Sequence, residues 1–94
     1  MNNIPVYKKL NTRIENNTIG TTVILYNTKI VYFDDKFIIL DNGNFMTNTT
    51  KNRMNQTSKE YNLNFYVYQK DFKWFVNHNG KTTEFMTSQV TITR

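Results

Sequence analysis

The side chains that could act as a general acid and base are few and widely spaced. Such a pair needs two titratable groups whose surroundings push their pKa values apart. Most of the seven acidic residues fall in turn-like segments or near expected strand ends, at no catalytic spacing: Glu15, Asp34, Asp35, Asp41, Glu60, Asp71 and Glu84. Asp34-Asp35 could bind a cation, but adjacent acids between two strands are typical of a turn. We therefore expect no acid–base site.

Nucleophilic, metal and phosphate-loop chemistry has equally little support. His78 is the single histidine and precedes Asn79-Gly80, so we expect it in a solvated loop. The chain contains no cysteine, and a metal site would need more nitrogen or sulfur ligands than are present. The three glycines stand alone, and a Ser or Thr nucleophile would lack a base. We predict a protein that is not an enzyme and has no cofactor and no metal site.

Basic residues interleaved with polar ones are the first feature that could bind a ligand. The net charge is +5, and basic domains attract polyanions through long-range forces and counterion release. Arginine and asparagine side chains match guanine and adenine edges respectively. The alternative is an ordinary solvated helix face. The candidate contacts are Lys51, Arg53, Asn55 and Lys59 on an expected helix, with Lys70 and Lys73 extending the basic surface.

Two tyrosines on an expected strand are the second such feature. Leu63, Phe65 and Val67 alternate with Asn64, Tyr66 and Tyr68, which is the pattern of a half-buried strand. Tyr66 and Tyr68 therefore point away from the apolar face and could stack unpaired bases. Alternatively, the helix or the N-terminal segment covers them.

The elements that must position these residues follow from hydrophobic periodicity. Residues 21–26, 29–33 and 36–40 read as three strands joined by two-residue polar loops at Asn27-Thr28 and Asp34-Asp35. In residues 47–61, Thr50, Met54, Thr57 and Tyr61 recur at helical spacing on one face. Thr47 or Asn48 is a suitable N-cap.

Strand patterns return after the expected helix. Residues 63–68, 72–76, 81–85 and 89–93 are rich in β-branched and aromatic residues. The turns between them are Lys70-Asp71 and Asn77-His78-Asn79-Gly80. The fold class is thus α+β: a β-meander, one α-helix and a second β-meander, with the helix packed on one face of an antiparallel sheet.

The chain length fits a single domain over residues 1–94. Residues 1–20 are polar and poorly periodic, so we expect an irregular segment or an edge strand at Val6-Tyr7-Lys8-Lys9-Leu10. No run approaches the roughly 20 apolar residues that cross a bilayer. The N-terminus also lacks the features of a secretion signal. These observations predict a cytoplasmic protein without a membrane partner.

Four segments resemble a family of short phage and prophage proteins: Leu40-Asp41-Asn42-Gly43, 49–56 (TTKNRMNQ), 67–70 (VYQK) and Trp74-Phe75-Val76. The likeness covers about residues 38–85. No activity is assigned to that family, so it transfers no catalytic or binding residue. It implies a mobile-element protein acting in the cytoplasm of a bacterial host cell.

Three functional classes are open for such a protein. The first is a nucleic-acid-binding module, for DNA or RNA. The second is an anti-CRISPR-like inhibitor that binds a host nucleic-acid-handling protein. The third is a structural protein that assembles through a sheet edge. The oligomeric state is not defined by the sequence.

Overall fold

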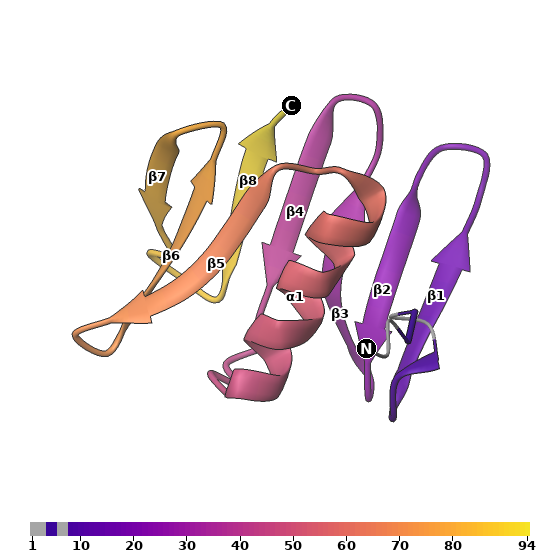
Figure 1. Cartoon of the computed structure of the whole chain (residues 1–94), viewed down its shortest axis with the longest axis horizontal. Helices are drawn as coiled ribbons and strands as arrows, with labels where there is room; N and C mark the ends of the chain where they lie inside the picture. Colours follow the sequence, from indigo (N-terminus) through magenta and orange to yellow (C-terminus); the bar gives the residue numbers. More distant parts are fainter. Residues whose placement is uncertain (1–3, 6–7) are drawn as a thin grey trace.

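The computed structural model describes residues 4–5 and 8–94, and these form one helix and two antiparallel sheets (Figure 1). The elements are β1 (Thr12–Asn16), β2 (Thr21–Leu25), β3 (Thr28–Phe33), β4 (Phe37–Asp41), α1 (Asn48–Tyr61), β5 (Phe65–Lys70), β6 (Lys73–His78), β7 (Lys81–Glu84) and β8 (Gln89–Thr93). The predicted α+β class and the order of meander, helix and meander are confirmed.

The strands divide between a large sheet of order β1-β2-β3-β4-β8 and a small sheet of order β5-β6-β7. The last strand, β8, thus leaves the second meander and pairs with β4 of the first. In Figure 1 the small sheet and α1 lie side by side in front of the large sheet. The helix contacts β5 of the small sheet as well as β2 and β3 of the large one.

The core lies between the two sheets and the helix. Val23, Val31, Ile38 and Leu40 of the large sheet are fully buried, and they cluster with Met54 of α1. The small sheet contributes Phe65, Val67, Trp74 and Val76. The alternating pattern predicted the burial of Phe65 and Val67. The Trp74 ring packs edge-on against Phe85 at 5.7 Å between centroids. Because each aromatic ring buries a large area, a small number of residues is enough to fill this core.

Both ends of α1 are capped by side-chain or backbone hydrogen bonds. Thr47 is the N-cap and its hydroxyl accepts from the Thr50 amide at 3.2 Å. Asn62 ends the helix in the left-handed conformation, with its N–H bonded to the Ser58 carbonyl. The predicted buried face is confirmed for Thr50, Met54 and Thr57.

Two predicted helix positions differ from the structure. Tyr61 was expected on the buried face but is exposed at the helix end, where its ring lies 5.0 Å from that of Phe33. Ser58, not predicted to be buried, is buried because its hydroxyl bonds to β5.

Two hairpin turns lie one residue away from the predicted positions. The β2–β3 turn is Tyr26-Asn27 rather than Asn27-Thr28, and the β5–β6 turn is Asp71-Phe72 rather than Lys70-Asp71. Polar residues were expected at the tips because they favour turns. The observed register instead puts Tyr26 (φ 56°) and Phe72 (φ 66°) at the tips, in the left-handed region.

The N-terminal prediction is only partly covered by the described residues. Val6 and Tyr7 of the expected edge strand lie outside them, and Lys8–Leu10 are not in a strand. The strand of this region is β1, which pairs with β2 at the edge of the large sheet. His78 was also predicted in a turn, yet it ends β6 opposite Lys81.

Candidate nucleic-acid interface

The cationic residues of α1 do not gather on one surface. The Lys51 ammonium bonds to the Gln69 side chain at 3.1 Å and lies 5.6 Å from the centre of the Trp74 ring, on the β5 side. The Arg53 guanidinium instead donates to the Thr12 hydroxyl of β1 at 3.1 Å. Lys51 and Arg53 are two positions apart on α1, so their side chains leave the helix axis about 200° apart and point in nearly opposite directions. Lys59 is exposed in the last turn.

Asn55 is engaged with the backbone of β5. Its amide nitrogen donates to the Val67 carbonyl at 2.9 Å and its oxygen accepts from the Val67 N–H at 2.7 Å. These bonds use both ends of the amide, the groups with which an asparagine would read adenine. We therefore leave Asn55 out of the contact surface proposed below.

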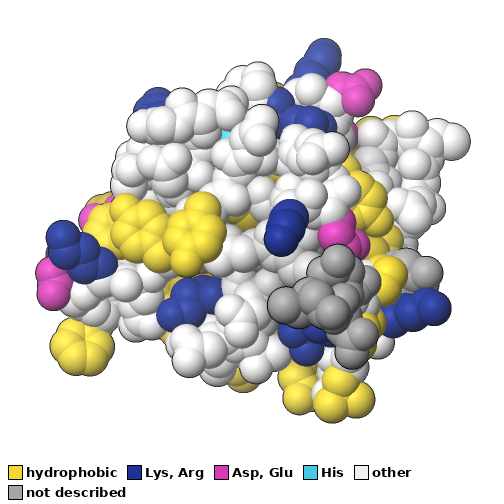
Figure 2. Space-filling view, viewed as in Figure 1, with side chains coloured by type: hydrophobic (Ala, Val, Ile, Leu, Met, Phe, Trp, Pro, Cys, Tyr) yellow, Lys and Arg dark blue, Asp and Glu magenta, His cyan; other side chains and the backbone are white. Residues whose placement is uncertain are grey.

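The small sheet presents an aromatic row on the face that points away from the core. Tyr66 and Tyr68 alternate with buried Phe65 and Val67, as predicted, and Phe75 of β6 pairs with Tyr68 across the strands. Tyr66 and Tyr68 have centroids 6.2 Å apart at 20°, and Tyr68 and Phe75 have centroids 5.5 Å apart at 21°. Figure 2 shows hydrophobic side chains over β5 with Lys or Arg side chains beside them.

Neither the helix nor the N-terminal segment hides this row completely, because Tyr66 is 60% exposed. Tyr68 and Phe75 are half-buried against their neighbours. We call Tyr66, Tyr68 and Phe75 the aromatic face. Its rings lie nearly parallel, so they offer one extended π surface rather than isolated side chains.

The hairpin tip at one end of the aromatic face carries two cations. Lys70 and Lys73 pair across β5 and β6, share the aromatic face's side of the sheet, and are exposed. Between them Phe72 is 91% exposed. Two acids border the same region: Asp71 in the turn and Glu84, which pairs with Phe75 from β7. The local charge is therefore nearly balanced.

Sequence reasoning missed Phe72 and Phe75 as members of this surface. Phe75 could have been found by pairing the two strands around their turn, since cross-strand partners share a face. Phe72 required knowledge of the turn register, because the predicted turn placed it inside a strand. Of the eight predicted contacts, the structure groups Tyr66, Tyr68, Lys70 and Lys73, and it separates Arg53 and Asn55 from them. The other two are on α1: Lys51 bonds to Gln69 of β5, and Lys59 is exposed in the last turn.

A polar cluster in the β3–β4 loop perturbs two titratable groups. The Asp34 carboxylate accepts hydrogen bonds from the Phe37 and Lys36 amides at 2.7 and 2.8 Å and from the Tyr32 hydroxyl at 2.9 Å. These bonds stabilise the ionised form and lower the Asp34 pKa. The same bond to Asp34 raises the pKa of Tyr32. This cluster fixes the loop and lies outside the aromatic face.

Among the described residues, no three His, Cys, Asp or Glu side chains lie close enough together to hold a metal ion. No helix in this part of the chain is both long enough and apolar enough to cross a membrane.

The fold and the surface together define a small α+β protein with an exposed aromatic sheet face. The family model described as Kyanoviridae Gp96 protein matches residues 1–92, and the chain belongs to this phage protein family. The predicted kinship with phage proteins is thus confirmed. Searches of curated proteins and of solved structures found no match.

Proposed function

We propose that this phage protein binds single-stranded nucleic acid on the aromatic face, as a non-catalytic binding protein without a cofactor. The observation that carries the proposal is the near-parallel row of Tyr66, Tyr68 and Phe75 on an exposed sheet surface. Bases of single strands are unstacked and can lie on such rings, whereas bases inside a duplex cannot.

The hairpin tip would complete the binding site. Lys70 and Lys73 stand at the end of the aromatic face, where they can contact backbone phosphates. Phe72 projects between them and can stack on one further base. Each base–aromatic stack contributes about 1–3 kcal/mol, so three rings suffice for measurable binding.

The balanced local charge makes a weak salt dependence the expected behaviour. With two phosphate contacts, the logarithm of affinity should fall against the logarithm of salt with a slope of about −1.4. Helix-based binding through Lys51, Arg53 and Lys59 would add contacts and steepen that slope. In this proposal, base stacking therefore contributes more to the affinity than phosphate contacts do.

Fluorescence anisotropy with labelled oligo-dT, oligo-U and a DNA duplex tests the proposal. Tyr66→Ala should weaken single-strand binding by about 5- to 150-fold, which corresponds to one lost stack of about 1–3 kcal/mol. Tyr26→Ala removes a tyrosine of similar exposure from another surface and is the matched control. Equal affinity of Tyr66→Ala and parent, or a preference for the duplex, would contradict the proposal.

The double variant Lys51→Ala/Arg53→Ala separates the two possible surfaces. It should keep most of the single-strand affinity, because these side chains point to opposite sides of α1. A loss of affinity as large as that of Tyr66→Ala would show that the helix, and not the aromatic face, binds the nucleic acid.

A second candidate function is anti-CRISPR-like inhibition of a host nucleic-acid-handling protein by protein–protein contact. It is favoured by exposed apolar side chains that a nucleic acid does not require, among them Tyr26, Phe45 and Met46. Pull-down from host lysate with and without nuclease separates the candidates: a partner that persists after nuclease and is lost with Tyr26→Ala supports inhibition.

A further inference from the structure

A pocket of about 250 Å³ lies between the end of β4, the β7–β8 loop and the β5–β6 hairpin tip. Its floor is formed by the buried residues Asn42, Trp74 and Phe85. Large exposed apolar side chains line its opening: Met46, Phe72 and Met86. Pockets for drug-sized ligands occupy about 300–1,000 Å³. This smaller pocket, with apolar walls, suits a single planar ring.

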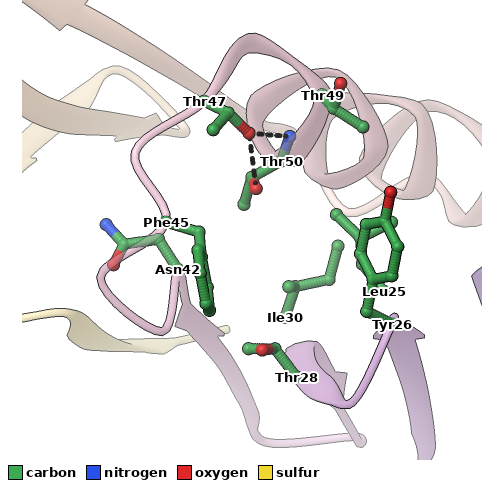
Figure 3. Close-up of a pocket in the computed structure, with 9 residues that line it drawn as sticks. All are labelled: Leu25, Tyr26, Thr28, Ile30, Asn42, Phe45, Thr47, Thr49 and Thr50. Carbon is green, nitrogen blue, oxygen red and sulfur yellow. Dashed lines mark hydrogen bonds between the residues drawn. The ribbon is translucent and has the colours of Figure 1, made fainter.

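Strand geometry turns Asn42 and Trp74 toward the space between the sheets. Asn42 continues the pairing of β4 with β8, because its N–H donates to the Ser88 carbonyl at 3.0 Å. Strand alternation then puts its side chain on the same side as buried Leu40. Figure 3 shows the Asn42 amide pointing away from a second cavity, beneath the first turn of α1, that Asn42 also lines. Trp74 lies on the inner face of β6, in the same buried cluster as Leu40.

The floor of this pocket contains hydrogen-bond donors without partners. Among residues 4–5 and 8–94, Trp74 Nε1 is the one buried side-chain polar atom that has no hydrogen-bond partner. An indole N–H can only donate. The Asn42 side-chain oxygen accepts from the Asn44 N–H at 2.8 Å, whereas its amide nitrogen makes no hydrogen bond to the described part of the chain. Because buried polar groups are rarely left unpaired, this floor fits a ligand that presents acceptors.

The acceptor that fits best is a neutral carbonyl group. Lys51 lies 5.6 Å from the centre of the Trp74 ring, but its ammonium is bonded to Gln69. Glu84 pairs with Phe75, so its side chain lies on the side of the aromatic face rather than on that of the floor. An anion at the floor would lose its hydration without an unpaired cation beside it. Two neutral donors can satisfy the carbonyl oxygen of an uncharged ring at no such cost.

The pocket is continuous with the surface proposed to bind single strands. Phe72 and Lys73 line it and also form the hairpin tip at the end of the aromatic face. Guanine and thymine present a carbonyl oxygen where adenine and cytosine present an amino group. An amino group facing the donors of Asn42 and Trp74 would leave them unpaired.

We propose that this pocket takes one base of the bound strand and selects the carbonyl-bearing bases guanine, thymine and uracil over adenine and cytosine. The inference rests on the nucleic-acid-binding function proposed above and adds a base preference to it. Asn42 and Trp74 would donate to the base, and Phe72 would cover one face of its ring.

The test uses labelled DNA hexamers of five cytosines and one test base, placed at either end. Hypoxanthine and adenine are the matched test bases, because they are purines that differ in a carbonyl or an amino group at one carbon. Fluorescence anisotropy should show about 5- to 150-fold tighter binding of the hypoxanthine strand. The indole N–H signal of Trp74, the only tryptophan, should shift in NMR spectra with that strand alone. Equal affinities, or a Trp74 signal that stays unchanged, would overturn the base pocket, whereas Tyr66→Ala separately decides the aromatic face.

Two chain variants test the Asn42 donor. Asn42→Asp keeps an oxygen for the Asn44 N–H and replaces the amino group by a second oxygen, so the preference should move toward adenine. Asn44→Asp places the same charge at an exposed position of the pocket and should weaken both strands without changing their ratio. A hypoxanthine preference that persists in Asn42→Asp would overturn the proposal.

Free nucleosides separate a failure of the pocket from a failure of strand binding. Inosine and adenosine are titrated into the parent chain while the Trp74 indole signal is followed. A shift with inosine alone supports the pocket even where no strand binds to the aromatic face. No shift with either nucleoside, or an equal shift with inorganic phosphate, would overturn it.

Discussion

At the residue scale, two aromatic side chains lie at hairpin tips in backbone conformations that bulky residues rarely adopt. Tyr26 and Phe72 have φ of 56° and 66°, where glycine, asparagine and aspartate are usual. Such conformations cost on the order of 1–3 kcal/mol each and persist where the surroundings determine them. Both residues belong to surfaces proposed to bind: Tyr26 to the exposed apolar residues of the second candidate function and Phe72 to the hairpin tip.

Tyr26→Asn should raise the free energy of unfolding by about 1 kcal/mol, because asparagine tolerates the left-handed region. Urea denaturation measures the change. The matched control is Tyr66→Asn, which makes the same substitution at a similarly exposed position inside a strand, where asparagine is disfavoured. A loss of stability in Tyr26→Asn that matches the control would show that the tip is not strained.

The lowered pKa of Asp34 predicts a pH-dependent contribution to stability. Its folded-state pKa lies below the ordinary value of 3.8, so its stabilisation is fully present above that pH. It is lost as pH falls through the lower, folded-state value. Asp34→Asn should therefore flatten the fall in the free energy of unfolding below about pH 4. Asp35→Asn, which removes a neighbouring charge, should keep the parent slope, and an identical flattening would exclude Asp34 as the cause.

At the element scale, α1 takes the place of a neighbouring strand along β5. The Ser58 hydroxyl bonds to the Phe65 carbonyl at 2.7 Å and to its N–H at 2.9 Å, and Asn55 holds Val67 in the same way. Asn55 and Ser58, three positions apart on the helix, thus bond to the backbone of Val67 and Phe65, two positions apart on the strand. The edge of β5 is thereby closed to further strands, which limits sheet-edge assembly.

Asn55→Asp should cost about 1–3 kcal/mol of stability, because a carboxylate cannot donate to the Val67 carbonyl and would repel it. Hydrogen exchange at the Val67 amide should accelerate in the same variant. Asn52→Asp makes the same change on the exposed side of α1 and should alter stability far less. Equal effects of the two substitutions would mean that α1 does not hold β5.

The sequence predicts the elements well and their side-chain partners poorly, for a physical reason. Alternation in 63–68 and the helical spacing of Thr50, Met54 and Thr57 are local patterns, so they located β5 and α1. The bonds of Asn55 and Arg53 depend on which strand lies beside each helix face, which no local pattern encodes. The predicted turns at Tyr26 and Phe72 were one residue off, because polar residues were assigned to the turns without considering which residues pair across the strands.

At the scale of the whole molecule, β8 joins the two sheets into one structure. The chain runs through the small sheet as β5, β6 and β7 and then returns to pair β8 with β4. Ile92 of β8 lies opposite Ile38 and belongs to the same buried cluster as Trp74 of the small sheet. The two sheets share their core, so neither can open without exposing the apolar side chains of the other.

Unfolding should therefore be a single transition that both sheets report together. Trp74 is the only tryptophan and lies in the small sheet, so its fluorescence follows that sheet while far-UV circular dichroism follows all elements. Ile92→Ala, in the large sheet, should lower stability by about 2–3 kcal/mol and move both midpoints equally. Ile39→Ala, one β4 position from the Ile92 partner and only partly buried, should shift both less. A Trp74 midpoint that stays fixed while the circular dichroism midpoint falls would mean that the small sheet and α1 fold independently of β8.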